Sequence, residues 1–400
     1  ADAQANKMEA KRWIQLDSLM QQGIDMTIQR KVVVTNAGIE QFLKKHYDIE
    51  NTATHIWNYF DMIILDEAHS LVSDATFSDS PFHVKSFLSA AYKYNGKCKI
   101  IFMTGTNEPI ENLLSSEIKQ SAMYNFLDTY GQCMHVEPQI VSLFPVTQVE
   151  WHLMQAINEG EQIIYFANSI SRIEKVVNTL IKNGISEENL GIAYADKSPS
   201  KSIKFSSTLL EIKKEIEETL IKEEKLPEKI KLFITTSKNK EGININDNNI
   251  RFMVSESCEK SALIQMAGRV RKGIDKLVIL YDAEQHNAYV GKDEMELDYF
   301  CLKSAQKYEK EKKSVEIDNK NAIEVIEKKF PTIRFNYITQ ECEYYYDRKK
   351  GYKQVERDRN LLLKIIRRWN NGGKDKFQEW FPYSKVTLNI ALTVDEEMEI

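Results

Sequence analysis

The strongest constraint on the fold is the stretch Met62–His69, in which a short apolar run ends in two adjacent acids, followed two residues later by a histidine. Four apolar residues flanked by polar sequence are typical of a strand that is buried on both faces in a parallel sheet. Charge cannot continue into such a sheet, so Asp66 and Glu67 are expected at the carboxyl end of the strand, where open α/β sheets bind ligands. Two acids there suit Mg²⁺, which prefers oxygen ligands. An acid pair that only caps a following helix is the alternative.

Strands and helices alternate through the first part of the chain. Ala1–Gln22 has apolar residues at roughly helical spacing and is expected to be an amphipathic helix. A strand, a helix, a second helix and a further strand are expected, in this order, at Lys31–Gly38, Ile39–His46, Phe82–Tyr94 and Lys99–Met103. Together with the strand before Asp66, this alternation predicts a doubly wound α/β domain.

A second, similar α/β unit is expected after Gln139–Pro145, which has the pattern of an extended connector. Its expected elements are a helix at Ser171–Asn183 and strands at Gln162–Ala167, Leu190–Tyr194, Lys231–Thr236, Arg251–Ser255 and Lys276–Tyr281. Residues 201–231 carry nearly balanced Lys and Glu and are expected to be a charged, solvated helical pair. We therefore expect three parts: residues 1–145, residues 146–290 and a mostly helical C-terminal extension, residues 291–400.

Length, charge and cysteine content narrow the class of protein. The 400 residues are too many for one hydrophobic core, and a net charge of −5 means that nucleic-acid binding must rely on local patches. The five cysteines are scattered and odd in number, which argues against a zinc site or a disulfide framework. No segment approaches the apolar length of a membrane span and the polar start is no signal peptide, so we expect a cytoplasmic protein without membrane contact.

Two hydroxyl-rich segments follow later strands. Thr104-Gly105-Thr106 ends a strand with two hydroxyls around a glycine, although a plain turn is the more common meaning of such a tripeptide. Thr235-Thr236-Ser237 leads into Glu241-Gly242-Ile243-Asn244, where a glycine would let the backbone approach a phosphate of a nucleotide or a nucleic acid. An Asn-rich surface turn is the alternative for the second segment.

The basic segment Gln265–Lys272 has the spacing of a helix end. Gln265 and Arg269 would share one helix face, and Gly268 would permit close packing. Arg269, with Arg271 or Lys272, can stabilise charge that develops on a γ-phosphate. A basic helix end that only complements its own dipole is the alternative.

Taken together, these segments closely resemble superfamily 2 helicases. Asp66–His69 matches the Asp-Glu-Ala-His box of motif II, and motifs III, IV, V, VI and Ib are matched by residues 104–106, 163–168, 235–244, 265–269 and 34–38. The resemblance covers roughly residues 30–285 and favours DNA translocases of the restriction and origin-binding types. It implies two RecA-like parallel-sheet domains that hydrolyse ATP with Mg²⁺ between them and couple hydrolysis to movement on DNA. An RNA helicase, or a non-catalytic helicase-like scaffold that binds nucleic acid or a partner, remains the alternative.

The resemblance also implies a role for each matched residue. Asp66 would ligate Mg²⁺, Glu67 would activate the attacking water, and Gln265 would sense the γ-phosphate. Arg269 and Arg271 would act as arginine fingers, although many relatives have the second finger at the position of Lys272. The other roles are coupling of hydrolysis to movement (His69, Thr104 and Thr106), contact with the nucleotide (Gly242, Asn244 and Lys272) and contact with nucleic acid (Thr35, Gly38, Thr104, Thr106 and Thr236).

One motif of these helicases is absent from the sequence. None of the fifteen glycines belongs to a GxxxxGK[ST] loop, because Gly96-Lys97-Cys98 and Gly372-Gly373-Lys374-Asp375 both lack the hydroxyl. In the family, the strand that carries this loop lies between the strands that end at Asp66 and at Thr104. We therefore expect that the first domain is N-terminally incomplete and that this stretch alone does not hydrolyse ATP.

The C-terminal extension contains Tyr344–Lys353, in which aromatic and basic residues are interleaved. Such a pattern suits stacking on bases and contact with phosphates. Structural use, or docking of a protein partner through the extension, is the alternative.

Overall fold

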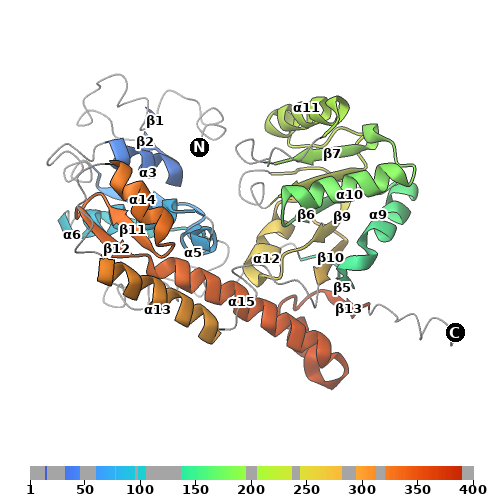
Figure 1. Cartoon of the computed structure of the whole chain (residues 1–400). Coiled ribbons are helices and arrows are strands. Elements are labelled where there is room, and N and C mark those ends of the chain that lie inside the picture. Colours follow the sequence, from blue (N-terminus) through green and yellow to red (C-terminus); the bar gives the residue numbers. More distant parts are fainter. Residues whose placement is uncertain are drawn as a thin grey trace. The chain divides into compact units, whose positions relative to one another are not determined.

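The computed structural model describes residues 14–15, 32–45, 60–76, 78–94, 98–104, 137–194, 205–236, 244–281, 294–311 and 320–389. The chain divides into two compact units (Figure 1). The first contains Ala1–Met123 and Asn287–Glu356, and the second contains Tyr124–His286 and Arg357–Ile400. The C-terminal part of the chain thus contributes to both units, which differs from a division into three consecutive ranges.

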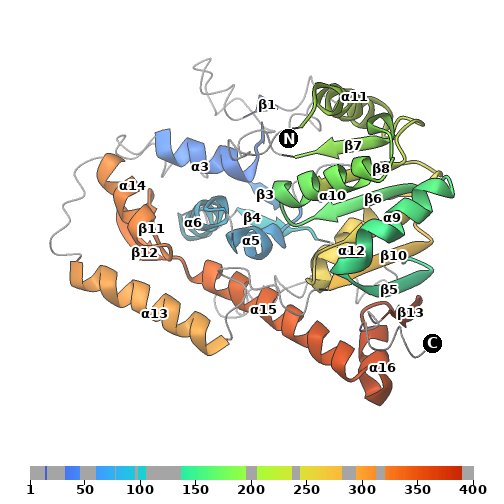
Figure 2. The ribbon, with the colours of Figure 1, turned by 45° about the vertical axis from the view of Figure 1, so that its right-hand side comes forward.

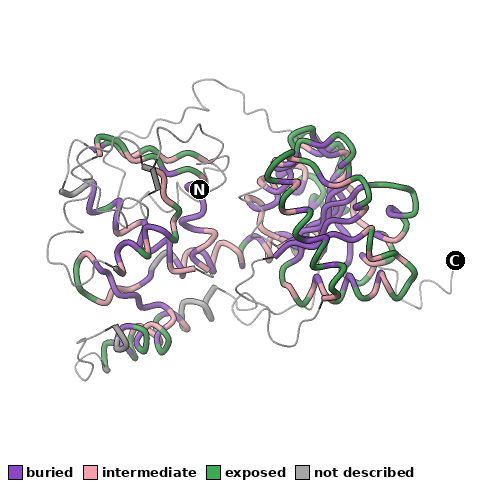
Figure 3. The backbone as a smooth tube through the Cα atoms, turned by 90° about the horizontal axis from the view of Figure 1, so that it is seen from above, coloured by how far each residue is buried: buried purple, intermediate pink, exposed green. Residues whose placement is uncertain are grey.

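The second unit is built on a seven-stranded parallel sheet, which confirms the predicted α/β class. The strand order is β13-β5-β10-β9-β6-β8-β7, and every pairing is parallel. The strands are β5 (Ile140–Pro145), β6 (Gln162–Ala167), β7 (Leu190–Ala193), β8 (Leu232–Thr236), β9 (Ile250–Ser255), β10 (Lys276–Tyr281) and β13 (Lys385–Leu388). Figure 3 shows that the central strands of this sheet are buried along their length.

Helices cover both faces of this sheet, which is why its strands are apolar at consecutive positions. Ile163 and Tyr165 pack with α9 (Val149–Asn158) and α10 (Ile170–Lys182), which Figure 2 shows alongside the strands. Ile164 and Phe166 point to the opposite face and pack with the remaining helices. These are α11 (Ser207–Glu223), α12 (Lys260–Gly268), the second half of α15 (Tyr346–Arg367) and α16 (Lys374–Gln378), with short turns η3 (Val146–Gln148), η4 (Glu187–Asn189) and η7 (Trp369–Gly373) between elements.

Two sequence predictions in this unit are wrong. Gln139–Pro145 is not a connector, because β5 pairs with β10 on one side and with β13 on the other. Its Val141 and Leu143 are fully buried in the core. Residues 201–231 are not a solvated helical pair, since the described part of this range forms one helix, α11, whose apolar residues at helical spacing are buried against the sheet: Leu209, Ile212, Ile216 and Leu220.

The first unit places two parallel strands, β3 (Met62–Leu65) and β4 (Lys99–Phe102), under helices. These strands pair directly with each other, so the expectation that another strand lies between them is wrong. The helical elements are α3 (Asn36–Lys45), α5 (Ser70–Ser73), η2 (Asp74–Thr76) and α6 (Ser80–Tyr94). Leu65 packs with Phe42 of α3 and Phe87 of α6 in one core. A separate short pair joins β1 (Ile14–Gln15) to β2 (Val32–Val33), so the helix expected at Ala1–Gln22 is a strand at these two positions, and its other residues lie outside the described part.

The prediction that β3 is buried on both faces is wrong. Met62 is 46% exposed and Ile64 is 53% exposed, and Ile101 and Met103 are exposed as well. These side chains share one face, because Ile64 pairs with Ile101 and alternate residues of a strand point the same way. Within the described residues, α3 and α6 cover only the face that carries Leu65.

The C-terminal part of the first unit combines helices with a hairpin. It contains α13 (Glu294–Glu311), α14 (Lys320–Lys329), the antiparallel pair β11 (Ile333–Asn336) and β12 (Glu341–Tyr344), and the start of α15. Phe335 of β11 packs into the same core as Phe42 and Phe87. Tyr345 is fully buried, so its ring is not available for stacking on a base. In the described part of the chain, no helix is long and apolar enough to cross a membrane.

Candidate functional site

The acid pair, the histidine and the first threonine of the predicted motifs lie together at the carboxyl ends of β3 and β4. Because these strands are parallel neighbours, the segments that follow them both begin at the same end of the sheet. The amide of Ala68 donates to the carbonyl of Met103 (2.9 Å), and the Nδ1 atom of His69 lies 3.1 Å from Thr104 Oγ1. The structure thus joins Asp66–His69 to the end of β4 through a backbone contact with Met103 and a side-chain contact with Thr104, while Thr106 lies outside the described residues.

Glu67 has an unusual backbone conformation at this edge. Its φ is 49°, in the left-handed region that costs a residue with a side chain roughly 1–2 kcal/mol. Glu67 N donates to Asp66 Oδ1 (3.0 Å), and Ser70 N donates to Glu67 O (2.9 Å), so hydrogen bonds on both sides hold the turn. The Glu67 carboxylate is partly exposed and lies 3.5 Å from Nδ1 of the buried His69. Such strain is typical of functional sites, where the surrounding structure maintains it.

The candidate nucleic-acid residues Thr35 and Gly38 lie beside the helix that follows His69. Asn36 Nδ2 donates to Ser70 Oγ (3.2 Å), which connects α3 to α5. Thr35 Oγ1 accepts a hydrogen bond from Gly38 N (2.9 Å). A Cβ at Gly38 would lie 2.7 Å from Val34 Cγ2, so a larger residue there would have to displace the Val34 side chain.

The second cluster of candidates lies where α12 ends. Gln265 lies within α12, whereas Arg269 directly follows Gly268, the last residue of the helix, and keeps a helical backbone. Ile245 N donates to Arg269 O (2.9 Å), and Arg271 N donates to Ile245 O (2.8 Å). This short parallel bridge brings the segment after β8 alongside the segment after α12.

Asn244 and Arg271 are in direct contact at this bridge. The Asn244 Oδ1 atom accepts hydrogen bonds from Arg271 Nη2 (2.7 Å) and Nε (3.2 Å). Lys272, the alternative second finger, instead lines a polar cavity of about 350 Å³ with Lys225 and residues 246–249. The choice between these two cations as second finger stays open, although the Arg271 guanidinium is the one held by two hydrogen bonds to Asn244.

Gly268 and Thr236 are two further candidate residues of the second unit that the structure describes. A Cβ added at Gly268 would meet no atom of the described residues within 4 Å, so among these residues the expectation that this glycine permits close packing is wrong. Thr236 is the last residue of β8 and lies at its carboxyl end. Asn244 and Arg271 come before the first residues of β9 and β10, so they lie toward the amino ends of these parallel strands. Gly242 lies outside the described residues.

Sequence reasoning did not single out Glu256, which organises a buried polar network after β9. Glu256 accepts hydrogen bonds from Tyr165 Oη (2.5 Å), Arg172 Nε (2.5 Å) and Asn168 N (2.8 Å), and Arg172 also pairs with Glu150 (3.0 Å). Burial, then the adjacent Glu256, raises the pKa of Tyr165 well above its usual value. The signal was present in the sequence, because Glu256 follows an apolar strand just as Asp66 does.

The residues at the first site fit a magnesium ion that keeps most of its water. Within the described ranges, no group of three or more His, Cys, Asp or Glu side chains is placed to hold a metal. Mg²⁺ in phosphate-transfer sites does not need such a cage, because one or two carboxylates, water and phosphate oxygens complete its shell. The exposed Asp66 carboxylate at the strand end can serve as the protein ligand.

Comparison with known proteins gives similarity to solved structures only. No protein-family model and no curated protein sequence matches the chain. Dbp5 of S. cerevisiae bound to RNA and ADP BeF3 is 14% identical, with a TM-score of 0.43, and the match covers 86% of this chain and 73% of that chain. Mycobacterium smegmatis helicase Lhr bound to ssDNA and AMP-PNP is 11% identical, with a TM-score of 0.43 and coverage of 85% and 48%. The DUF1998 helicase MrfA bound to DNA and AMPPNP is 15% identical, with a TM-score of 0.45 and coverage of 70% and 40%.

All three of these proteins are bound to a nucleic acid, and two of them, Lhr and MrfA, are named as helicases. The chain spans less than half the length of Lhr and of MrfA. Identities of 11–15% and TM-scores below 0.5 do not establish a shared activity.

Proposed function

We propose that this chain is the motor portion of an ATP-dependent superfamily 2 helicase or translocase that acts on DNA. The observation that supports it best is the convergence of Asp66, Glu67, His69 and Thr104 at the shared carboxyl edge of β3 and β4. A turn that serves only to cap a helix has no need for a strained glutamate beside a buried histidine. In the proposed reaction, one carboxylate would hold a metal ion and the other would accept a proton from the water that attacks the phosphoanhydride.

The proposed roles at this edge follow from exposure and contact. Asp66 is exposed and would hold Mg²⁺, which would supply positive charge beside the transferring phosphate. Glu67 accepts the proton of the attacking water. His69 contacts both the Glu67 carboxylate and the Thr104 hydroxyl, so it relays changes between the acid pair and the end of β4. Thr104 and Thr106, with Thr35, Gly38 and Thr236, contact the DNA backbone.

In this proposal, the side chains that contact the γ-phosphate come from the second unit. Gln265 senses the γ-phosphate, and Arg269 neutralises charge that develops on it. We assign the second finger to Arg271 rather than Lys272, because Asn244 fixes the Arg271 guanidinium by two hydrogen bonds. A cation that is already oriented loses less freedom when it binds a phosphate. Gly242 and Lys272 are assigned to the nucleotide as weaker contacts.

The residues present do not fit every part of a nucleotide. The sequence has no GxxxxGK[ST] loop, so we assign no residue to the β-phosphate and derive no step there. This absence supports a second candidate function, a helicase-like scaffold that binds nucleic acid without hydrolysis.

Phosphate release separates the two functions. The protein at its full natural length is assayed for ATP hydrolysis with no nucleic acid, with DNA and with RNA, and binding of each nucleic acid is measured in parallel. The motor proposal expects hydrolysis that DNA stimulates more than RNA. Nucleic-acid binding with no phosphate release above a blank establishes the scaffold and refutes the motor.

A further inference from the structure

A single helix, α15, contacts the segment that follows Asp66–His69 and the helix that carries Gln265. Its residues 346–356 belong to the first unit and its residues 357–367 to the second. In each unit, a charged side chain of α15 binds backbone groups at the end of a helical segment.

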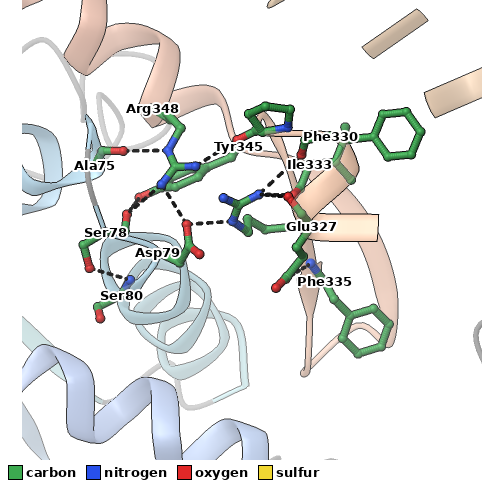
Figure 4. A network of polar contacts seen from close by, with 12 residues as sticks. Ala75, Ser78, Asp79, Ser80, Glu327, Phe330, Ile333, Phe335, Tyr345 and Arg348 are labelled. Carbon is green, nitrogen blue, oxygen red and sulfur yellow. Dashed lines mark hydrogen bonds and ion pairs between the residues drawn. The ribbon is translucent and has the colours of Figure 1, made fainter. Parts of the chain in front are cut away.

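In the first unit, Arg348 binds the chain directly after α5 and η2 (Figure 4). The buried Arg348 guanidinium donates to the carbonyls of Ala75 (2.8 Å) and Ser78 (3.4 Å) and to the carboxylate of Asp79 (2.8 Å). It also donates to the carbonyl of Pro331 (2.9 Å). Asp79 is paired a second time, by Arg334 Nε at 2.7 Å. The polar groups that end this helical segment are therefore met by a cation from the C-terminal part of the chain.

The next turn of α15 approaches the same segment even more closely. A Cβ added at Gly351 would lie 2.8 Å from Val72 O and 3.1 Å from Thr76 Cγ2. Tyr352 Oη donates to Thr76 O (3.3 Å). Glycine at position 351 thus allows α15 to pack directly on the backbone that follows His69.

In the second unit, Asp358 binds the first turn of α12. Its buried Oδ2 atom accepts a hydrogen bond from Lys260 N (3.1 Å), the first residue of the helix. Glu259, the N-cap residue of α12, makes no capping hydrogen bond with its own side chain. Asp358 therefore supplies from 98 positions away a cap that Ser, Thr, Asn or Asp at the N-cap position usually provides.

The signs of the two charges match the two helix ends. A helix carries partial positive charge at its amino end and partial negative charge at its carboxyl end. Asp358 is an anion at the amino end of α12, and Arg348 is a cation at the carboxyl end of the segment formed by α5 and η2. Both contacts lie on the helical segments that follow or carry proposed catalytic residues.

We propose that Asp358 is a positioning residue for Gln265 and Arg269, and that Arg348 does the same for the segment after Asp66–His69. The description of these segments as motifs rests on the proposed function, but the capping contacts do not. Asp358 touches no reacting atom in this proposal. It fixes the amino end of α12 and hence the position at which Arg269 leaves that helix.

The test replaces Asp358 by Ala and by Asn, with Asp375→Ala as the matched control on an exposed aspartate of the same unit. Amide exchange is followed by mass spectrometry in a peptide that covers α12 and in one that covers β6. Asn keeps an oxygen that accepts the Lys260 amide hydrogen, whereas Ala does not. We expect exchange in α12 to be about fivefold faster in Asp358→Ala and within twofold of wild type in Asp358→Asn, with β6 unchanged.

Three results would overturn this role: no change of α12 in Asp358→Ala, no recovery in Asp358→Asn, or equal loss of protection in α12 and β6. The same variants are then assayed for ATP hydrolysis, where positioning predicts a lower kcat with recovery by Asn and little change in KM. The exchange measurement does not depend on activity. A wild-type protein without hydrolysis therefore refutes the proposed function and leaves the capping role to the exchange data.

Discussion

His83 provides a quantitative prediction about the core of the first unit. It is buried on α6 between the rings of Phe82 (5.3 Å) and Tyr337 (5.4 Å). Within the described part of the chain, neither ring nitrogen has a hydrogen-bond partner. Burial lowers the pKa of His83 from 6.5 to about 4, although the nearby Glu40 and Asp79 carboxylates act in the opposite direction. The ring is therefore neutral in the folded protein at neutral pH.

The sign and size of the effect on stability follow from these two pKa values. Between pH 6.5 and 4 the unfolded chain binds a proton at His83 and the folded chain does not, so the free energy of unfolding decreases as pH falls. Above pH 6.5 neither state binds it, and below 4 both do. The loss is about 2 kcal/mol at pH 5 relative to pH 8, and about 3 kcal/mol once pH is below 4.

The variant His83→Leu removes this titratable group and places an apolar side chain at the same position in the core. Urea unfolding of both proteins, followed by circular dichroism at pH 8 and pH 5, gives two free energies of unfolding for each. Subtracting one protein from the other cancels the pH dependence of all other groups. We expect the wild type to lose about 2 kcal/mol more than the variant between these two pH values. Equal losses in the two proteins would show that His83 is not held neutral.

Three further variants test other contacts. Arg348→Met removes the donor to the carbonyls of Ala75 and Pro331, so it should lower the free energy of unfolding by about 1–3 kcal/mol in urea. Gly268→Ala should be neutral or stabilise by up to about 1 kcal/mol, because a Cβ meets open space there, whereas Gly351→Ala should destabilise and shift the helix it belongs to; equal thermal midpoints for the two would contradict this contrast. Arg271→Ala should lower kcat for ATP hydrolysis at least about tenfold and Lys272→Ala less than about threefold, and the reverse order would move the second finger to Lys272.

Strand positions in the second unit were predictable because both faces of its sheet are covered. β6 and β10 begin and end at the predicted residues, since an unbroken apolar run is visible without knowledge of neighbours. β5 was missed because its partners are distant: β10 and β13 follow it by more than a hundred residues. β3 has the same apolar run as a fully buried strand, yet one of its faces is exposed, and local sequence does not distinguish these cases.

In the candidate site, too, some arrangements follow from the sequence and others do not. His69 and Thr104 were both expected at the carboxyl end of one sheet, but their direct contact was not, because another strand was expected between β3 and β4. The contact between Asn244 and Arg271 depends on a bridge between residues 245 and 270, which no periodicity reveals. Arg348 lies in a basic and aromatic segment whose composition suited nucleic acid, and only the packing shows that it binds the chain itself.

The most direct test of the proposed hydrolytic centre is the rate of DNA-stimulated ATP hydrolysis in Glu67→Gln. Glu324→Gln, on an exposed position of α14, is the matched control for loss of a carboxylate in the same unit. Both variants are measured at the full natural length of the protein, beside the wild type, with DNA binding as a check on folding. If Glu67 activates the attacking water, kcat falls by about 10²–10⁴-fold in Glu67→Gln and stays unchanged in Glu324→Gln. Hydrolysis by Glu67→Gln at the wild-type rate would contradict the account.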